Sequence, residues 1–201
     1  MQLARYLDEL QQWNRRMNLT ALRGDAEIAL FHFADSLALA PQLAPTEPLL
    51  DIGTGAGFPG LPVKLALPGL PLTLLEATAK KVSFLRHLVR VLGLRGVTVL
   101  DGRAEALGAV PGLQAAFGAV TARALGDLPK TVRLGAPFLR PGGRLLAMRG
   151  SQGPVEVREA AVAVGQAGLI AEAVIPYRLP GLRAPRHLVV LRRPRVFHVE
   201  Q

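Results

Sequence analysis

The segment from Leu49 to Gly60 constrains the fold more than any other part of this 201-residue chain. Its apolar first half leads directly into three alternating glycines, Gly53, Gly55 and Gly57, followed by Pro59. Glycines after a buried strand let the backbone turn sharply and approach a ligand closely, and proline is tolerated in the first turn of a helix. The segment therefore predicts the first strand-loop-helix unit of a nucleotide-binding α/β fold, although a tight turn without a ligand also uses such glycines.

The chain after residue 49 alternates short apolar runs with helical segments, which is typical of βαβ units around a parallel sheet. The clearest helix runs from Thr78, its expected N-cap, to Leu92, and Gly93 ends it. Another helix is expected over residues 154–167. The predicted strands are residues 49–53, 72–76, 97–101, 117–121, 144–148, 169–175 and 187–192. The sequence thus predicts a Rossmann-like α/β fold with a seven-stranded, mostly parallel sheet and helices on both faces.

The first forty residues predict two helices. The apolar positions that recur at helical spacing in the first are Leu3, Tyr6, Leu7, Leu10, Trp13 and Met17, and the pattern breaks at Asn18-Leu19-Thr20. The second is expected over residues 25–40, and its candidate buried positions are Ile28, Phe31, Leu37 and Leu39. We expect residues 1–45 to form an N-terminal helical cap on a Rossmann-like domain of residues 46–201, the two making one compact unit.

The composition narrows the chemistry and the partners. The chain contains no cysteine, so a disulfide scaffold, a thiolate zinc site and a cysteine nucleophile are excluded, and no metal is expected. No signal-peptide core or 18-residue apolar run occurs, so we expect a cytoplasmic protein without a membrane segment. The formal charge of +9 and the many arginines favour a polyanionic partner, with a merely solvated arginine-rich surface as the alternative.

Two acidic residues support an adenosine site beside the glycine loop. Glu76 ends the second apolar run, where a carboxylate can accept hydrogen bonds from both ribose hydroxyls. Glu105 and the Ala104 backbone follow the third apolar run, where they can lie over the adenine. The spacing Gly-x-Gly-x-Gly differs from the Gly-x-Gly-x-x-Gly fingerprint that admits a dinucleotide pyrophosphate. The chain also lacks the Tyr-x-x-x-Lys of a short-chain reductase, because Leu10 and Gly181 follow Tyr6 and Tyr177 at that spacing. These features favour S-adenosylmethionine and a class I methyltransferase over a nicotinamide enzyme.

The residues after the fourth predicted strand discriminate among methyl acceptors. Cytosine C5 requires a cysteine, which is absent, and the Asn/Asp-Pro-Pro-aromatic motif of exocyclic-amine methylation is also missing. The ribose 2′-O tetrad fits poorly, because Asp127 lies four residues beyond Arg123. Guanine N7 carries a lone pair and no proton, so positioning without a general base is enough. Arg123 is then a candidate to orient the cofactor carboxylate or guanine O6, with a surface ion pair as the alternative.

Ordered sequence blocks along nearly the whole chain resemble the bacterial small-subunit ribosomal RNA guanine-N7 methyltransferases, historically called glucose-inhibited division protein B. The blocks are Trp13-Asn14, Asn18-Leu19-Thr20, His32-Phe33-Ala34-Asp35-Ser36, Asp51 to Gly60, Leu75-Glu76-Ala77-Thr78 with Lys80-Lys81-Val82-Ser83-Phe84-Leu85, Gly102-Arg103-Ala104-Glu105, Ala122-Arg123-Ala124, Met148-Arg149-Gly150 and Arg186-His187-Leu188-Val189-Val190. The resemblance implies methylation of one guanosine, conventionally position 527, in the decoding-region loop of 16S rRNA. Members often have Lys where this chain has Arg149.

The expected site residues come from the resemblance, from the glycine loop and from the positions of the basic residues. The expected cofactor contacts are Asp51, Gly53, Gly55, Phe58, Glu76, Ala77, Thr78, Ala104, Glu105 and Arg123. Arg103, Arg123 and Arg186 are candidates for catalysis by positioning or for RNA contact. The candidate basic rim for RNA phosphates is Arg15, Arg16, Lys80, Lys81, Arg149, Arg183 and Arg186.

Several alternatives stay open at this point. His32 and Asp35 share a helix face and are expected to fix the cap to the core rather than meet substrate, and Asn18 with Thr20 is expected to form a turn. The partner is expected to be 16S rRNA or the small ribosomal subunit, bound by a monomer. The alternative functions are an RNA-binding ribosome-assembly factor without turnover, methylation at another RNA position, and methylation of a protein or small molecule.

Overall fold

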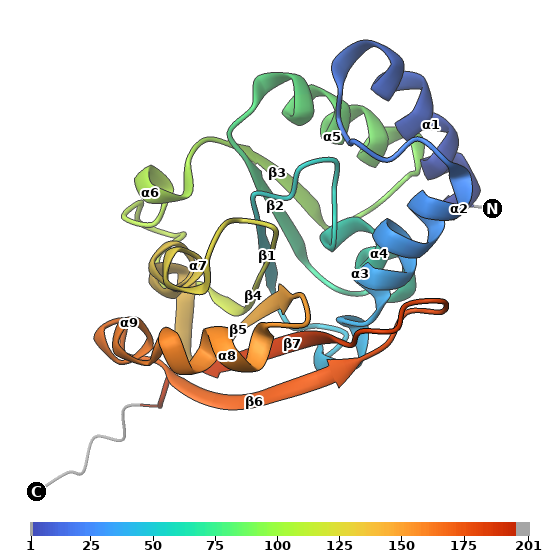
Figure 1. Ribbon diagram of the computed structural model, residues 1–201. Coiled ribbons are helices and arrows are strands. Elements are labelled where there is room, and N and C mark those ends of the chain that lie inside the picture. The colour runs from blue at the N-terminus through green and yellow to red at the C-terminus, as the bar shows by residue number, and fades with distance from the viewer. Residues whose placement is uncertain (1, 196–201) are drawn as a thin grey trace, which may run out of the picture.

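The computed structural model describes residues 2–195 and contains a seven-stranded sheet in the order β3-β2-β1-β4-β5-β7-β6 (Figure 1). The first five strands are parallel, and β7 runs antiparallel to both of its neighbours. The strands are β1 Leu49–Ile52, β2 Leu72–Glu76, β3 Val97–Asp101, β4 Phe117–Arg123, β5 Leu139–Arg149, β6 Ile170–Tyr177 and β7 Arg186–Arg192. The strand order reverses between β1 and β4, so the carboxyl ends of these two strands flank the crevice where open α/β sheets bind ligands.

The predicted strands are confirmed in number and order, and β3 matches its predicted bounds. The largest difference is in β5, which begins at Leu139 rather than at residue 144. Pro141, Gly142 and Gly143 resemble a turn in the sequence, yet the chain keeps pairing with β4 through a register shift between Phe117 and Ala119. A β-bulge absorbs the extra residues without ending the strand pairing.

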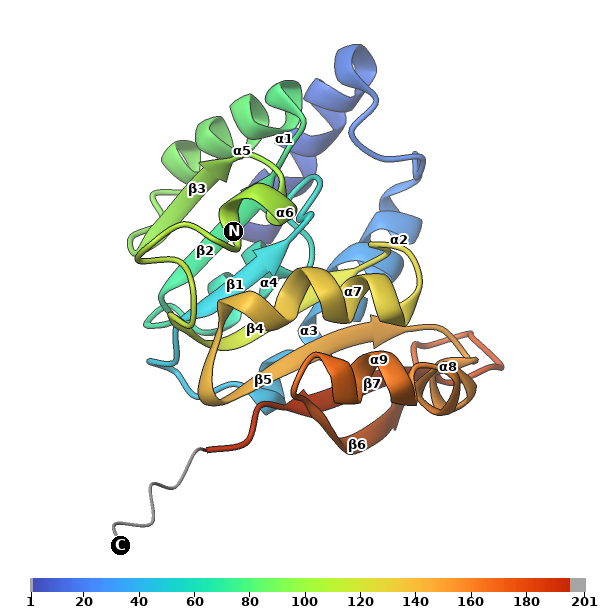
Figure 2. The ribbon, with the colours of Figure 1, turned by 90° about the vertical axis from the view of Figure 1, so that its left-hand side faces the viewer.

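Helices cover both faces of the sheet, as predicted (Figure 2). Alternate residues of the strands point into two separate apolar layers. One layer contains Leu49 of β1 and packs under α1 (Gln2–Met17), α4 (Gly60–Ala66) and α5 (Ala79–Val91). The other layer contains Leu50 of β1 and packs under the second group of helices. That group comprises α6 (Ala104–Leu107), α7 (Leu128–Gly135), η3 (Ala136–Phe138), α8 (Gly153–Glu159) and α9 (Ala161–Gln166). The helix predicted over 154–167 is thus interrupted at Ala160.

The N-terminal helices lie over the same face as α4 and α5. The helix expected over residues 25–40 is continuous to Leu37 but changes type, with α2 (Asp25–Ile28), a π-helical stretch η1 (Ala29–Ala34) and α3 (Asp35–Leu37). A 3₁₀ turn, η2 (Ala40–Gln42), follows. The wider π turn rotates the residues that come after it, and Phe33 is buried where Phe31 was expected. Leu37 and Phe31 are only half-buried.

The helix α5 begins and ends as the sequence predicts. Thr78 occupies the N-cap position, although its side chain makes no capping hydrogen bond. Gly93 has the left-handed φ of 64° that a helix-ending glycine adopts. In residues 2–195, no helix is long and apolar enough to cross a bilayer.

Candidate functional site

The glycine loop fits its surroundings so closely that side chains are excluded at two positions. Gly53 has φ 64°, and a Cβ atom there would lie 2.7 Å from Leu125 Cδ1. Gly57 has φ 100°, and a Cβ atom there would lie 2.5 Å from Leu61 and 2.6 Å from the Tyr6 hydroxyl. Both positions therefore require glycine for two reasons, backbone conformation and space.

Asp51 holds this loop in place through two hydrogen bonds. Its Oδ2 accepts hydrogen bonds from Thr54 Oγ1 at 2.6 Å and from the Gly60 backbone N–H at 2.9 Å. Complete burial raises the pKa of the carboxyl to about 7, against the opposing effect of these two bonds. Its Oδ1 has no partner within the described chain, and Asp51 does not line either pocket beside the loop. The contacts shown thus give Asp51 a role in shaping the loop.

Glu76, at the end of β2, joins the loop to the start of α5. Its Oε2 accepts a hydrogen bond from the Gly55 N–H and its Oε1 accepts one from the Thr78 N–H, both at 2.9 Å. The side chain is buried to 6% exposure. Each carboxylate oxygen has two lone pairs, so each retains capacity for one further donor, as two ribose hydroxyls would provide.

A pocket of about 260 Å³ lies on one side of Gly53 at the carboxyl ends of β1, β2 and β3. It brings together six of the predicted site residues: Gly53, Glu76, Ala77, Arg103, Ala104 and Glu105. Ile52, Leu75, Gly102, Leu125, Lys130 and Leu134 complete the lining. Leu125 and the α7 residues Lys130 and Leu134 come from beyond β4, and no sequence motif marked them as site residues.

A second pocket, of about 220 Å³, lies on the other side of Gly53. It contains the predicted residues Gly53, Gly55, Phe58, Arg123 and Lys81. Six further residues line it: Leu19, Thr20, His32, Thr54, Ala56 and Ala124. Because both pockets share Gly53, the glycine loop separates two halves of one candidate site. Thr78 and the predicted rim residues other than Lys81 line neither half.

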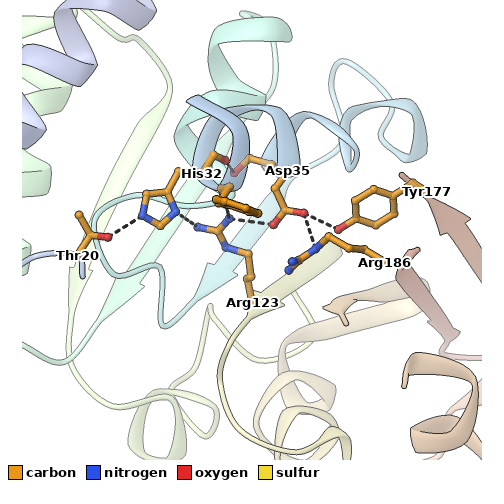
Figure 3. A network of polar contacts seen from close by, with 8 residues as sticks. Thr20, His32, Asp35, Arg123, Tyr177 and Arg186 are labelled. Atoms are coloured by element: carbon orange, nitrogen blue, oxygen red, sulfur yellow. Dashed lines mark hydrogen bonds and ion pairs between the residues drawn. The ribbon is translucent and has the colours of Figure 1, made fainter. Parts of the chain in front are cut away.

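Arg123, at the end of β4, reaches across this second pocket to the π-helical stretch (Figure 3). Its Nη1 donates to the Phe31 carbonyl at 2.9 Å and to Asp35 Oδ2 at 3.1 Å, and its Nη2 donates to His32 Nδ1 at 3.1 Å. Its guanidinium carbon lies 5.3 Å from the centre of the Phe58 ring. Three of its five N–H groups are used in this way, and within residues 2–195 the other two have no acceptor. A π turn at such a position is typical of functional sites.

Asp35 is the centre of the network in Figure 3. Its Oδ1 accepts a hydrogen bond from the Tyr177 hydroxyl at 2.8 Å and pairs with Arg186 Nε, also at 2.8 Å, while its Oδ2 binds Arg123. The side chain is 1% exposed. Asp35 and His32 together therefore connect the N-terminal segment to β4, β6 and β7, and His32 also lines the second pocket.

His32 is held as a neutral ring. Burial and the nearby Arg123 charge lower its pKa to about 4, and its ring stacks on Phe58 with 4.4 Å between centroids. Its Nε2 lies 2.7 Å from Thr20 Oγ1. Tyr6 stacks on Phe58 as well, at 5.2 Å. The aromatic contacts thus link α1, the glycine loop and the π-helical stretch.

The predicted basic rim divides into exposed side chains and side chains that are paired within the protein. Arg15 and Arg16 at the end of α1, Lys80 in the first turn of α5 and Arg183 before β7 are exposed. Arg149 instead bonds to Glu156 on α8 and donates to the Gly126 carbonyl at 2.8 Å, and Arg186 pairs with Asp35.

A larger pocket, of about 430 Å³, lies beside η3 and α9 and shares no lining residue with the two pockets around Gly53. It lies near Ala136 and Pro137, just before β5 begins, and it includes Arg133 and Arg193. Open parallel sheets bind ligands at the carboxyl ends of their strands. The two smaller pockets around Gly53 are therefore the candidate site despite their size.

Solved structures with this architecture include methyltransferases and a protein in complex with AdoMet. A putative O-methyltransferase from Klebsiella pneumoniae matches with a TM-score of 0.62 and 21% identity, covering 94% of this chain and 90% of that one. TYW2 from M. jannaschii, solved in complex with AdoMet, matches with a TM-score of 0.64 and 13% identity, covering 82% of this chain and 76% of that one. At these identities the likeness establishes the fold alone. The fold is the seven-stranded, Rossmann-like architecture of S-adenosylmethionine-dependent methyltransferases.

Sequence relatives are far closer. A protein of Roseiflexus castenholzii named ribosomal RNA small subunit methyltransferase G is 46% identical over 191 residues, covering 94% of this chain and 81% of that protein. A protein of the same name from Geobacter sp. strain M21 is 42% identical over 188 residues, covering 94% and 86%. The family model described as rRNA small subunit methyltransferase G (GidB) matches residues 1–189. This chain therefore belongs to the rRNA small subunit methyltransferase G family.

Proposed function

We propose that this protein transfers the methyl group of S-adenosylmethionine to N7 of one guanosine in the decoding-region loop of 16S rRNA. The choice of N7 rests on one observation: among the described residues, no side chain that lines the second pocket is free to act as a general base. Of the described residues that line it, none is Asp, Glu or Tyr, and its titratable members are His32, Lys81 and Arg123. Both ring nitrogens of His32 are already engaged by Arg123 and Thr20. An acceptor atom that carries no proton suits such a pocket.

The glycine loop and Glu76 fit the cofactor. At Gly53 and Gly57 no side chain covers the loop backbone. The Glu76 carboxylate, which lines the first pocket, retains lone pairs that can accept further hydrogen bonds. We propose that Glu76, Ala77, Ala104 and Glu105 hold the adenosine in that pocket. The further proposed cofactor contacts are Gly53, Gly55, Phe58 and Arg123. Asp51 and Thr78, which line neither pocket, are proposed to support the cofactor through the glycine loop and through Glu76. When bound, S-adenosylmethionine supplies an electrophilic methyl group on a positively charged sulfur.

The protein's own contribution is then positioning and charge. The ion pair and hydrogen bonds of Arg123 hold its guanidinium fixed beside Phe58, so its two remaining N–H groups have a defined direction. Fixed donors need no reorganisation when charge moves during the reaction. Arg103 lines the first pocket and Arg186 is held by Asp35, and both are proposed to position cofactor or RNA.

The proposed RNA surface surrounds this site. Arg15, Arg16, Lys80 and Arg183 are exposed and bind phosphates, and the +9 charge attracts the polyanion. Lys81, which lines the second pocket, also contacts the RNA. Arg149 binds the RNA after a phosphate replaces its ion-pair partner Glu156. We propose a monomer that acts in the cytoplasm without a metal, with residues 1–45 as a cap on residues 46–201.

The test is incubation of the purified chain with unmodified small ribosomal subunits and S-adenosylmethionine labelled in its methyl group. After digestion, the label should be recovered in 7-methylguanosine. Recovery in another nucleoside contradicts the N7 assignment. Tight RNA binding without any label would identify a ribosome-assembly factor instead.

A further inference from the structure

The loop after α1 holds Thr20 in a fixed position beside the second pocket. Asn14 brackets its backbone, because Asn14 Oδ1 accepts from the Thr20 N–H and Asn14 Nδ2 donates to the Thr20 carbonyl, both at 3.0 Å. Asn14 itself is 4% exposed, and Asn18 turns the chain with a φ of 49°. The expected turn at Asn18 and Thr20 is present, and it is anchored from inside α1.

The hydrogen bonds around His32 assign the proton on its ring. Arg123 Nη2 can only donate, so His32 Nδ1 must accept. A neutral ring then carries its hydrogen on Nε2, which donates to Thr20 Oγ1 at 2.7 Å. The low pKa of His32 agrees with a neutral ring near pH 7.

Thr20 Oγ1 consequently accepts two hydrogen bonds. The second comes from the Leu22 N–H at 3.2 Å. A hydroxyl oxygen has two lone pairs and one hydrogen, so both lone pairs are occupied and the hydrogen remains. Within residues 2–195, no acceptor receives that hydrogen, and Thr20 lines the second pocket together with Gly55, Phe58 and Lys81.

We propose that the Thr20 hydroxyl is a ligand-binding donor that points its hydrogen at an oxygen acceptor in the second pocket. This inference rests on the proposed function. Two groups of the proposed ligands would offer oxygen acceptors in that pocket: the carboxylate of the cofactor's amino-acid end and O6 of the target guanine. Because both lone pairs are used, Thr20 cannot accept from an N–H group. An adenine amino group in the place of guanine O6 would therefore meet a donor instead of an acceptor, and the position selects against adenine.

The first experiment tests the carboxylate. Calorimetry measures binding of S-adenosylhomocysteine and of 5′-methylthioadenosine, which lacks the amino-acid end, to wild type, Thr20→Val and Thr20→Ser. Valine keeps the shape but removes both donor and acceptor, whereas serine keeps both. If the carboxylate is the acceptor, Thr20→Val weakens S-adenosylhomocysteine binding by about tenfold more than 5′-methylthioadenosine binding, and Thr20→Ser restores it.

The second experiment tests guanine O6. Subunits are reconstituted with 16S rRNA that carries either guanine or 2-aminopurine, which lacks O6, at the methylated position. If O6 is the acceptor, Thr20→Val lowers kcat/KM on guanine by about tenfold or more but changes it little on 2-aminopurine. Thr20→Ser retains the wild-type preference.

Differential loss in either experiment supports the proposal and identifies the acceptor. Thr20→Val also leaves the His32 Nε2–H without its partner, so a loss that is equal for all four ligands would mean a structural role and would overturn the proposal. No loss at all would overturn it as well. If the wild type produced no 7-methylguanosine, the proposed function would fail, while the calorimetric comparison would still report on Thr20.

Discussion

The Tyr6 hydroxyl donates a hydrogen bond of 2.6 Å to the carbonyl oxygen of Ala56, which lies fifty positions further along the chain. Both residues are buried, and the contact joins α1 to the middle of the glycine loop. A loop of glycines has many accessible conformations, so an external contact is needed to keep one of them. The N-terminal helix therefore contributes to the shape of a site from which it is distant in sequence.

Tyr6→Phe should weaken both the fold and the site. The substitution keeps the ring stacked on Phe58 but leaves the buried Ala56 carbonyl without this donor, which should lower the free energy of unfolding by about 1–3 kcal/mol. Urea unfolding measures this loss, and calorimetry should show weaker binding of S-adenosylhomocysteine. Leu3→Ala, at an exposed position of the same helix, is the control and should change stability by less than about 0.5 kcal/mol. Unchanged cofactor affinity in Tyr6→Phe would show that the loop holds its shape without α1.

Asp35→Ala should be among the most destabilising substitutions in the chain. It removes a buried carboxylate from two arginines and a tyrosine, Arg123, Arg186 and Tyr177, and should cost about 3–5 kcal/mol in the free energy of unfolding. The matched control is Glu172→Ala, which breaks an exposed pair with Arg192 and should cost less than about 1 kcal/mol. Equal losses in the two variants would contradict the importance of the Asp35 network.

Glu76→Gln should reduce cofactor affinity more than it reduces stability. Gln offers one oxygen and one NH₂ group where two backbone N–H groups and two ribose hydroxyls require acceptors. Loss of charge-assisted hydrogen bonds of about 1.5–3 kcal/mol corresponds to about 10- to 150-fold weaker binding of S-adenosylhomocysteine. Glu159→Gln, an exposed carboxylate on α8, is the control and should bind as the wild type does. Wild-type affinity in Glu76→Gln would exclude the carboxylate from cofactor binding.

Asp51 should give the protein a measurable pH dependence. Its folded-state pKa of about 7 lies above the ordinary value of 3.8, so between these values the folded state holds more protons than the unfolded state. The stability associated with the protonated carboxyl is complete below about pH 4 and is lost as pH rises to about 7, with a slope of up to about 1.4 kcal/mol per pH unit. Urea unfolding of wild type and Asp51→Asn at several pH values isolates this group in the difference. A difference that stays constant from pH 4 to 7 would show that Asp51 is ionised throughout.

Lys80→Ala should change the salt dependence of RNA binding. If Lys80 contacts a phosphate, the slope of log affinity against log salt concentration should become shallower by about 0.7–0.9. The control is Arg95→Ala, which removes the same charge from an exposed position just before β3, at the amino ends of the strands and not at the carboxyl ends where Lys80 follows β2. Filter binding at four salt concentrations gives both slopes. Equal slopes for the two variants would mean that only overall charge matters.

The sequence by itself determined the features that depend on neighbouring residues. The strand β3 and the helix α5 have local apolar periods and end signals, so their bounds could be predicted within a residue or two. Glu76 could be assigned to the site because it ends β2, and the carboxyl ends of neighbouring parallel strands meet at one edge of the sheet. The glycine loop has the same kind of local signal.

The tertiary structure alone decided which distant segments complete the site. Thr20 and Tyr6 come from the N-terminal segment, and Asp35 meets Arg123 and Tyr177 across 88 and 142 positions of the chain. No sequence period encodes such contacts, because they depend on how the cap packs over the sheet. The change from α- to π-helix at Ala29–Ala34, which presents the Phe31 carbonyl and His32 to Arg123, likewise has no local signal. It is stabilised by contacts that exist only after the cap has docked.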